Sequence, residues 1–193
     1  MSGLQFLGEF VRDPVGLGAV APSGPQLARI EVDAADIQPH HVVVELGAGT
    51  GPMTAEIVKR PHRGFVSLEP NPALAATLRG RFPDVQVDER YAQQLPTILA
   101  ELGYDQADRV VSSLPWAIWP QELQEEIFSA ILQILAPDGR FVTFSYLHAK
   151  PLPAARRFRA TLDAHFREVH TSQVAWLNVP PAFVFVCEGA RTP

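Results

Sequence analysis

Cysteine and long apolar runs are the features that this sequence most clearly lacks. Its 193 residues include one cysteine, Cys187, which excludes an intramolecular disulfide framework and a cysteine-based zinc cluster. Cys187 lies in an apolar run, so we expect it in the core. No uncharged apolar stretch reaches the ~18 residues that a bilayer span requires. A basic segment leading into an apolar one is also missing after Met1, so we expect no secretory signal and a cytoplasmic location.

Signatures of several other chemistries are absent as well. The six histidines show no ligand spacing with one another or with Cys187, so no metal site is expected. A G-x-S-x-G elbow, which marks many hydrolases, does not occur. Residues 1–145 hold ten Lys/Arg against eighteen Asp/Glu, whereas residues 146–193 hold six against three. Proteins that wrap duplex nucleic acid usually carry a basic footprint over the whole domain, so nucleic acid is not the expected partner.

Apolar residues are plentiful, at 47%, and their arrangement predicts the fold. Short β-branched runs alternate with amphipathic segments, which indicates a mostly parallel sheet with helices on both faces. The last two apolar runs have no helix between them, which predicts an antiparallel terminal hairpin. We expect one domain over 1–193 with a Rossmann-like α/β fold and a seven-stranded sheet. The expected strands are 41–46, 64–69, 85–87, 109–113, 140–146, 168–177 and 182–188. The expected helices are 25–33, 72–82, 92–101, 120–135 and 153–165, and one more helix is expected to begin at Pro52.

The N-terminal region predicts a cover over the site. Residues 2–13 place four apolar side chains on one helical face, and the helix is expected to end at Pro14. A glycine- and proline-rich stretch follows, in which Ser23 is positioned to cap a second helix over 25–33. We expect residues 1–33 to cover the cofactor and acceptor site.

A glycine-rich turn follows the first predicted strand, with the sequence Glu45-Leu-Gly47-Ala-Gly49-Thr-Gly51. Its glycines allow a tight turn and close approach of a ligand to the backbone. A dinucleotide fingerprint would need its third glycine at position 52, which is proline. The spacing G-x-G-x-G after an acidic residue resembles motif I of the class I methyltransferases that use S-adenosylmethionine (SAM). The resemblance implies that Glu45, Gly47, Gly49 and Gly51 contribute to SAM binding.

Two further positions extend this resemblance along the chain. The second predicted strand ends at Glu69, where a carboxylate can accept both ribose hydroxyls, as the matching acid does in that superfamily. After the third strand the superfamily often has an acidic residue followed by alanine, which holds the adenine amine. Here Tyr91 occupies the acidic position and Ala92 matches the alanine. Asp88 is the alternative holder if the strand ends earlier.

The fourth predicted strand leads into a corner that resembles the acceptor site of amine-modifying methyltransferases. The corner reads Ser112-Ser113-Leu114-Pro115-Trp116, and it retains the proline and the aromatic residue of the family pattern while lacking its asparagine. The resemblance implies that Ser112 contacts the cofactor, that backbone groups of Ser113 and Leu114 orient the amine, and that Trp116 packs on the acceptor. A tryptophan buried in the core is the alternative interpretation.

Three stretches together resemble the bacterial phospholipid N-methyltransferases: 13–23, 112–115 and 176–184. Members of this family methylate phosphatidylethanolamine and attach peripherally to the inner face of the membrane. The resemblance implies an amphipathic N-terminal helix at the membrane and a tyrosine beside the phospholipid headgroup. In this sequence these are residues 2–13 and Tyr146, and Asn178 in the third stretch is an expected substrate contact.

The charge pattern leaves two alternatives open for membrane contact. Residues 2–13 carry Arg12 against two acidic residues, so this helix either binds lipid or packs on the domain as a lid. The basic stretch 150–167 includes Arg156 and Arg157, which are candidates for substrate phosphate, with a solvated helix face as the alternative. Tyr146, His148 and water are the candidate proton acceptors.

We therefore expect a SAM-dependent N-methyltransferase that acts on phosphatidylethanolamine-type phospholipids. Three alternatives remain open. The first is a methyltransferase for a small soluble amine. The second is an rRNA adenine methyltransferase, which shares the glycine turn and the Leu-Pro-aromatic corner. The third is a SAM-binding domain without catalysis, which the tyrosine at position 91 mildly favours.

Overall fold

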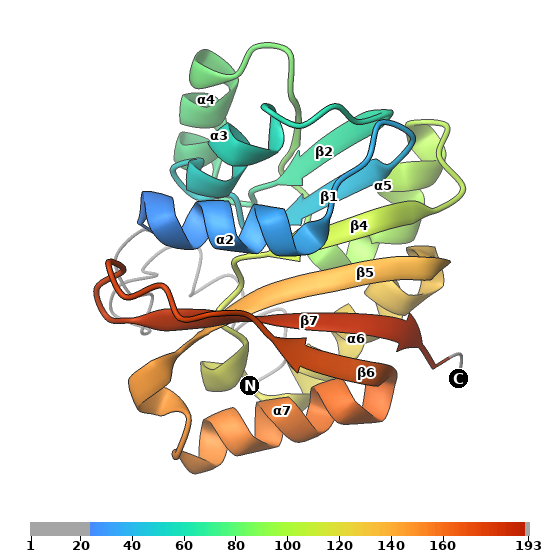
Figure 1. Ribbon diagram of the computed structural model, residues 1–193. Coiled ribbons are helices and arrows are strands. Elements are labelled where there is room, and N and C mark those ends of the chain that lie inside the picture. Colours follow the sequence, from blue (N-terminus) through green and yellow to red (C-terminus); the bar gives the residue numbers. More distant parts are fainter. Residues whose placement is uncertain (1–23, 192–193) are drawn as a thin grey trace.

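A computed structural model describes residues 24–191 of the chain, and it contains the predicted α/β sheet. Within these residues a seven-stranded sheet has the order β3-β2-β1-β4-β5-β7-β6 (Figure 1). Strands β1 to β5 are parallel to one another, and β7 runs antiparallel to both β5 and β6. The predicted Rossmann-like fold with a terminal hairpin is confirmed. The strands are β1 Val42–Leu46, β2 Gly64–Leu68, β3 Gln86–Asp88, β4 Ala107–Ser112, β5 Leu135–Tyr146, β6 Phe166–Thr171 and β7 Ala182–Ala190.

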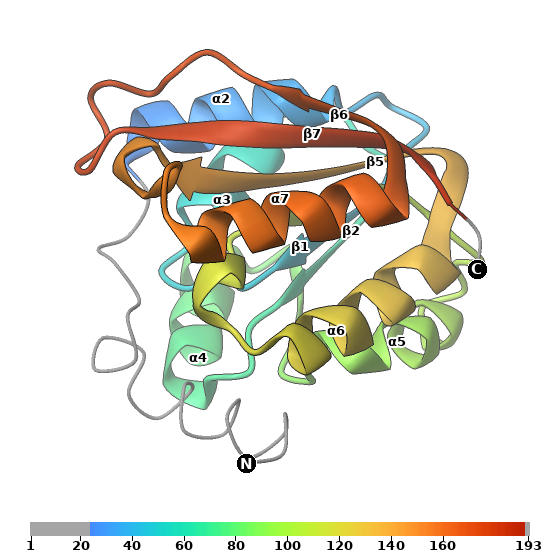
Figure 2. The same ribbon diagram turned by 90° about the horizontal axis from the view of Figure 1, so that it is seen from below.

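Helices cover both faces of the sheet and give a three-layered arrangement (Figure 2). Helices α2 and α3 pack on one face, whereas α5, α6 and α7 pack on the other. Helix α4 lies near β3 and packs on Ala48 and Val87. The helices are α2 Pro25–Ala35, α3 Pro52–Ile57, α4 Pro72–Arg81, α5 Leu95–Glu101, α6 Gln121–Ile134 and α7 Pro153–His165.

Proline and asparagine determine where several helices begin. Pro25, Pro52, Pro72 and Pro153 each occupy the first helical position, where a missing N–H costs no hydrogen bond. Asn71 caps α4, because its side-chain oxygen accepts hydrogen bonds from the backbone N–H groups of the first helical turn. The N-cap of α2 is Gly24 and makes no side-chain cap. The predicted cap, Ser23, lies outside the described residues, as does the predicted helix 2–13.

Two strand boundaries differ from the prediction by five residues or more. Strand β5 begins at Leu135 instead of 140, because Leu135 already pairs with Ala107 of β4 before an irregularity in the register. The Pro-Asp-Gly segment at 137–139 therefore lies inside the strand and does not precede it. Strand β6 ends at Thr171 instead of 177, and beyond it Ala175 forms an isolated antiparallel bridge with Ala182.

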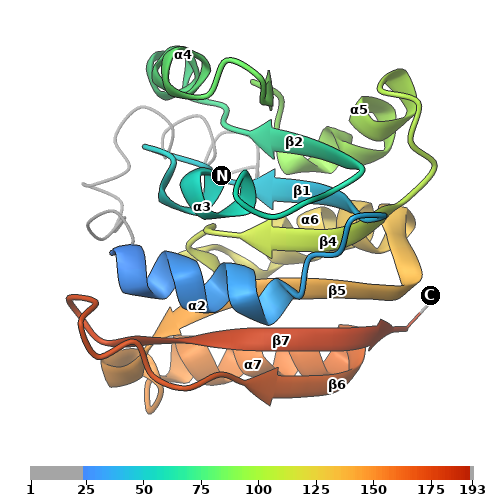
Figure 3. The same ribbon diagram turned by 45° about the horizontal axis from the view of Figure 1, so that its top comes forward.

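The order of the strands determines where a ligand can lie. The order reverses between β1 and β4, so the loops that follow these two strands diverge to opposite faces. The carboxyl ends of β1, β2, β4 and β5 meet at one edge, on the left in Figure 1 and again in Figure 3. In open α/β sheets the crevice at this edge is the place for ligands.

Candidate functional site

The glycine turn between β1 and α3 has the backbone conformation that only glycine adopts easily. Gly47, Gly49 and Gly51 have φ angles of 74°, 58° and 85°. A Cβ placed on Gly49 would meet no atom within 4 Å, so the turn opens on free space at this residue. A Cβ on Gly51 would approach side chains of α4 to 2.8 Å. Gly49 therefore borders the space for a ligand, whereas Gly51 allows the turn to pack on α4.

Glu69 follows β2 and closes the same turn. Its Oε2 accepts a hydrogen bond from the Gly49 N–H at 2.7 Å, and its Oε1 accepts one from the Asn71 N–H at 2.9 Å. The residue is buried, and burial raises the pKa of the carboxyl. Each carboxylate oxygen can accept a second hydrogen bond, so the pair of ribose hydroxyls of a nucleoside fits this carboxylate. The open turn beside an acceptor carboxylate fits SAM, which carries ribose and no pyrophosphate.

Glu45 lies beneath the turn in a buried polar cluster. Its Oε2 accepts hydrogen bonds from the hydroxyls of Thr54 and Ser67, both at 2.8 Å. Its Oε1 is buried without a hydrogen-bond partner. Burial raises the pKa of Glu45 to about 7, against the lowering effect of the two hydroxyls. The residue thus anchors β1, β2 and α3 to one another under the glycine turn.

Glu31 on α2 is a second acid near this cluster. It is fully buried, neither carboxyl oxygen has a hydrogen-bond partner, and its pKa is raised well above the ordinary value by burial and then by Glu45. Such surroundings favour the neutral acid, because an isolated buried charge costs far more than a neutral carboxyl. Glu31 was not among the residues predicted from the sequence, although its spacing from Leu27 and Ala35 indicates a polar residue on the apolar face of the helix.

The end of β3 holds the residues expected near adenine. Tyr91 precedes a short 3₁₀ helix over Ala92–Gln94, and both Tyr91 and Ala92 follow the carboxyl end of the strand. Asp88 is the last residue of β3, but its carboxylate binds the Arg90 guanidinium at 2.8 Å. This hydrogen bond holds the pKa of Asp88 below its ordinary range. Tyr91 and Ala92 therefore stay the proposed adenine contacts, because the Asp88 carboxylate is already hydrogen-bonded to Arg90.

The corner after β4 differs from the expected acceptor site in one respect. Trp116 is 2% exposed, and its ring stacks with both Phe128 and Phe158, at centroid distances of 4.6 and 5.7 Å. Its indole N–H donates to the Ser112 hydroxyl at 3.0 Å. Trp116 therefore lies in the core, as the alternative interpretation had it, and does not face a substrate. Ser112 was expected at the cofactor, and its fully buried hydroxyl instead holds the Trp116 indole.

Ser113, Leu114 and Tyr146 remain beside the crevice. The Ser113 N–H donates to the Leu46 carbonyl at 2.9 Å, which ties the ends of β1 and β4 together. The Leu114 side chain lies against Gly47, whose added Cβ would approach it to 2.8 Å. Tyr146 is the last residue of β5, and partial burial raises the pKa of its phenol. The phenol is therefore protonated at neutral pH and can donate or accept a hydrogen bond.

The predicted anion and headgroup contacts lie at the same edge but in different surroundings. Arg156 and Arg157 are exposed on the first turns of α7. Asn178 is 4% exposed, and both the oxygen and the nitrogen of its side-chain amide are hydrogen-bonded within the protein. Its Oδ1 accepts from the Gly24 N–H at 2.8 Å, and its Nδ2 donates to the Pro180 carbonyl at 2.7 Å. Asn178 thus ties the β6–β7 loop to the start of α2, a role different from the expected substrate contact.

One group of potential metal ligands occurs in the described part of the chain. Glu168, His170 and Glu188 of the terminal hairpin place ligand atoms within 4.8 Å of one another. Glu188, however, binds the Arg140 guanidinium at 2.7 Å, and the other two residues are exposed. Cys187 is buried in β7 as expected for a core residue. No described helix has both the length and the apolar character required to cross a bilayer.

Comparisons with known proteins agree with this site. The family model described as a methyltransferase domain matches residues 43–139, which include the glycine turn, Glu69 and the corner after β4. An ornithine lipid N-methyltransferase from Singulisphaera acidiphila is 38% identical over 96% of this chain and 95% of its own length. A probable ribosomal RNA small subunit methyltransferase A from Methanosarcina acetivorans is 34% identical, but over 48% of this chain and 32% of its own length.

The solved structures show the same fold. A SAM-dependent O-methyltransferase from Thermotoga maritima superposes with a TM-score of 0.66 over 95% of this chain and 72% of its own, at 13% identity. The family match, the near full-length relative and the geometry of the glycine turn agree with one another. The chain therefore belongs to the class I SAM-dependent methyltransferases, and SAM is its methyl donor.

Proposed function

We propose that this enzyme methylates the amine of a membrane lipid, with an ornithine-type lipid as the first acceptor to test. The near full-length similarity to an ornithine lipid N-methyltransferase carries this proposal. The rRNA enzymes match about half of this chain and about a third of their own length. A lipid acceptor is therefore favoured over an rRNA base.

SAM, when bound, supplies a methyl group on a sulfonium that an amine attacks in line. The chain aligns the two reactants, and alignment alone contributes several kcal/mol, up to ~10. We assign the nucleoside to the turn at Gly49 and the ribose to Glu69. Backbone groups at Ser113 and Leu114 are assigned to orient the acceptor amine, because they follow β4 beside the turn.

Tyr146 completes the proposed acceptor site. Its phenol lies at the end of β5 and stacks on His148 at a centroid distance of 5.8 Å. Because burial raises the pKa of the phenol, Tyr146 is not the base that takes the proton from the amine. We assign it to a hydrogen bond with the neutral amine, while His148 or water accepts the proton.

Phosphatidylethanolamine is the second acceptor to test. Three stretches of the sequence resemble the phospholipid N-methyltransferases, and both lipid classes place an amine beside an anionic group. Arg156 and Arg157 are exposed at this edge and fit either a headgroup phosphate or a carboxylate.

A radiolabelled methyl-transfer assay tests the proposal. The purified enzyme and labelled SAM are incubated in parallel with ornithine lipid, phosphatidylethanolamine, rRNA and a panel of small amines. Label in a lipid supports the proposal, and the two lipids differ in whether the anion beside the amine is a carboxylate or a phosphate. Label in rRNA or only in a soluble amine would overturn it.

A further inference from the structure

The loop between β6 and β7 presents a patch of large apolar side chains to solvent. Trp176, Leu177 and Val179 are 66%, 80% and 83% exposed, and they are the three most exposed large apolar residues of the described chain. Single exposed apolar residues are ordinary on protein surfaces. Three of them within four positions, including a tryptophan, form a concentrated patch that indicates a binding surface. We call these three residues the loop patch.

The loop patch lies at the edge of the sheet that holds the site. Strand β7 is antiparallel to β5, and its first residue, Ala182, pairs with Tyr146, the last residue of β5. The loop over 172–181 therefore begins and ends at the carboxyl edge of β5. The views in Figures 1 and 3 agree, since both place this loop beside the start of α2 and the carboxyl ends of the parallel strands.

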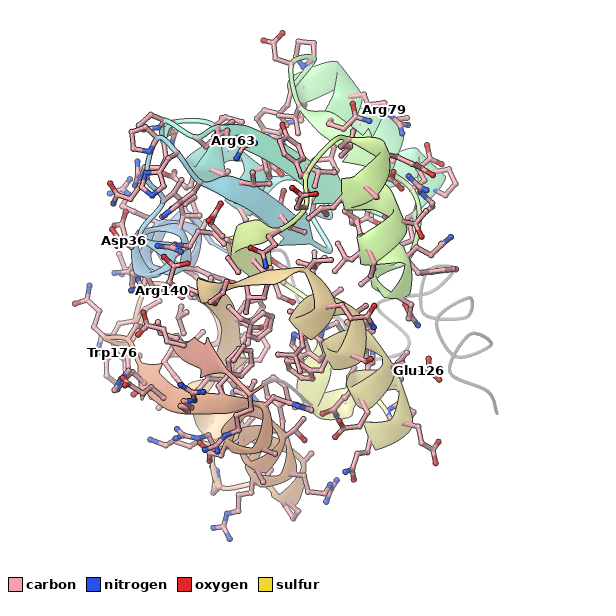
Figure 4. The ribbon with its side chains drawn as sticks, turned by 90° about the vertical axis from the view of Figure 1, so that its right-hand side faces the viewer. Asp36, Arg63, Arg79, Glu126, Arg140 and Trp176 are labelled. Carbon is pink, nitrogen blue, oxygen red and sulfur yellow. The ribbon has the colours of Figure 1, made fainter. Side chains whose placement is uncertain are left out.

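Hydrogen bonds hold the loop backbone in place. The Leu177 N–H donates to the Gln26 side chain at 2.8 Å, and the Asn178 amide joins the loop to Gly24. The Ala175 N–H donates to the Ala182 carbonyl at 2.7 Å, which closes the base of the loop. The backbone is thus fixed while the apolar side chains point away from it, and Figure 4 shows Trp176 at the margin of the molecule. A preformed surface of this kind binds with little loss of chain entropy.

Basic residues accompany the loop patch along the same edge. Lys150 lies in the connection after β5, and Arg156 and Arg157 lie on the first turns of α7. All three are exposed, and none of them is in an ion pair with another residue of 24–191. Leu152, which is 51% exposed, lies between them. Aromatic and aliphatic side chains beside uncompensated cations match the apolar and anionic layers of a membrane surface.

We propose that the loop patch inserts into the surface of a lipid bilayer and that the neighbouring cations face its anionic headgroups. This proposal rests on the lipid acceptor argued above and names the surface by which the enzyme reaches it. The insertion places the crevice at the ends of β4 and β5 against the headgroup layer, where the amine of a lipid lies. No lipid needs to leave the bilayer completely for its amine to reach the site.

Tryptophan fluorescence gives a direct measurement of this insertion. The chain has three tryptophans, and Trp116 and Trp119 are 2% and 5% exposed. A change in emission on adding vesicles therefore reports on Trp176. Wild-type enzyme is titrated with vesicles of equal parts phosphatidylethanolamine and phosphatidylglycerol, and separately with phosphatidylcholine vesicles. We expect a blue shift and protection from acrylamide quenching with the anionic vesicles, and a weaker effect with phosphatidylcholine.

Variants of the patch separate docking from catalysis. The triple variant Trp176→Ser/Leu177→Ser/Val179→Ser should sediment with anionic vesicles at least tenfold less than wild type, because a buried large side chain is worth about a tenfold gain or more. Val58→Ser is the matched control, since Val58 is 41% exposed after α3 and lies outside the patch. Arg156→Ser/Arg157→Ser should reduce binding at low salt, whereas Arg63→Ser, at the opposite edge before β2, should not.

The outcomes distinguish the docking proposal from the proposed function. The triple variant should retain SAM affinity and methylation of a short-chain monomeric ornithine lipid, while losing methylation of the same headgroup in vesicles. Equal vesicle binding by wild type and the triple variant would overturn the docking proposal. Loss of a wild-type dimer in the triple variant, without vesicle binding by either protein, would overturn it in favour of a subunit interface. A wild-type enzyme that methylates neither monomeric nor vesicular lipid would overturn the proposed function itself.

Discussion

The buried carboxyl of Glu45 should make the stability of this enzyme fall as the pH rises. Its pKa is raised by burial from the ordinary 4.5 to about 7. Between these values the folded protein holds a proton that the unfolded chain releases, so the stabilisation is complete below about pH 4.5 and is lost by about pH 7. At about 1.4 kcal/mol per pH unit, Glu45 alone accounts for about 3 kcal/mol over this interval. Glu31 acts in the same direction.

The variant Glu45→Gln removes this titrating group and, with it, the effect of Glu45 on the pKa of Glu31. The amide retains an oxygen for the hydroxyls of Thr54 and Ser67 but does not titrate. Urea unfolding of both proteins between about pH 4.5 and pH 8 should show wild type losing about 3 kcal/mol relative to the variant. Buried His41 and half-buried His62, whose pKa values are lowered by burial, affect both proteins equally and cancel in the difference.

An exposed carboxyl provides the control for this measurement. Glu122 is exposed at the start of α6, so Glu122→Gln should track wild type across the whole pH range. A difference in unfolding free energy between wild type and Glu45→Gln that stays constant within about 0.5 kcal/mol, the scatter of independent mutational effects, would refute this prediction. A constant difference would mean that Glu45 is ionised in the folded protein throughout, with a partner for its second oxygen.

Three further changes have defined outcomes. Glu69→Gln should weaken SAM binding at least tenfold in calorimetry, because a charge-assisted hydrogen bond is worth about 1.5–3 kcal/mol, and unchanged affinity would remove Glu69 from the site. Trp116→Ala should cost about 3–5 kcal/mol and lower the melting temperature by roughly 10 °C, whereas a normal melting temperature with lost turnover would restore the acceptor role predicted from sequence. Asn178→Ala should expose the β6–β7 loop to proteolysis and cost about 1–3 kcal/mol, and an equally resistant loop would show that Asn178 does not hold it.

The sequence alone predicted the sheet because local signals agree with the global fold here. The buried run at 42–46, the glycine spacing after it and the proline at the start of α3 all indicate the same strand-turn-helix unit. Glu69 was predictable for the same reason, because it directly follows an apolar strand. Boundaries were less predictable: β5 extends back to Leu135 because of its pairing with β4, a partner distant in the chain.

The roles of individual polar and aromatic side chains depended on the tertiary structure. Trp116 stands in an acceptor-like sequence, yet helices α6 and α7 bring Phe128 and Phe158 around its ring and take it into the core. Asn178 stands in a family-like stretch, yet the approach of α2 occupies its amide.

The proximity of Glu31 to Glu45 and the exposure of the loop patch could not be predicted from the sequence either. Glu31 became one of a pair of buried acids only when α2 packed on the sheet. The loop patch became visible as a surface because the hairpin places Trp176 at the edge that holds the site. Periodicity and motif spacing are properties of short segments, so the sequence by itself determined the fold class, the glycine turn and Glu69. Burial and contact across the sheet depend on residues far apart in the chain, so only the folded structure decided which side chains face the crevice, the core or the solvent.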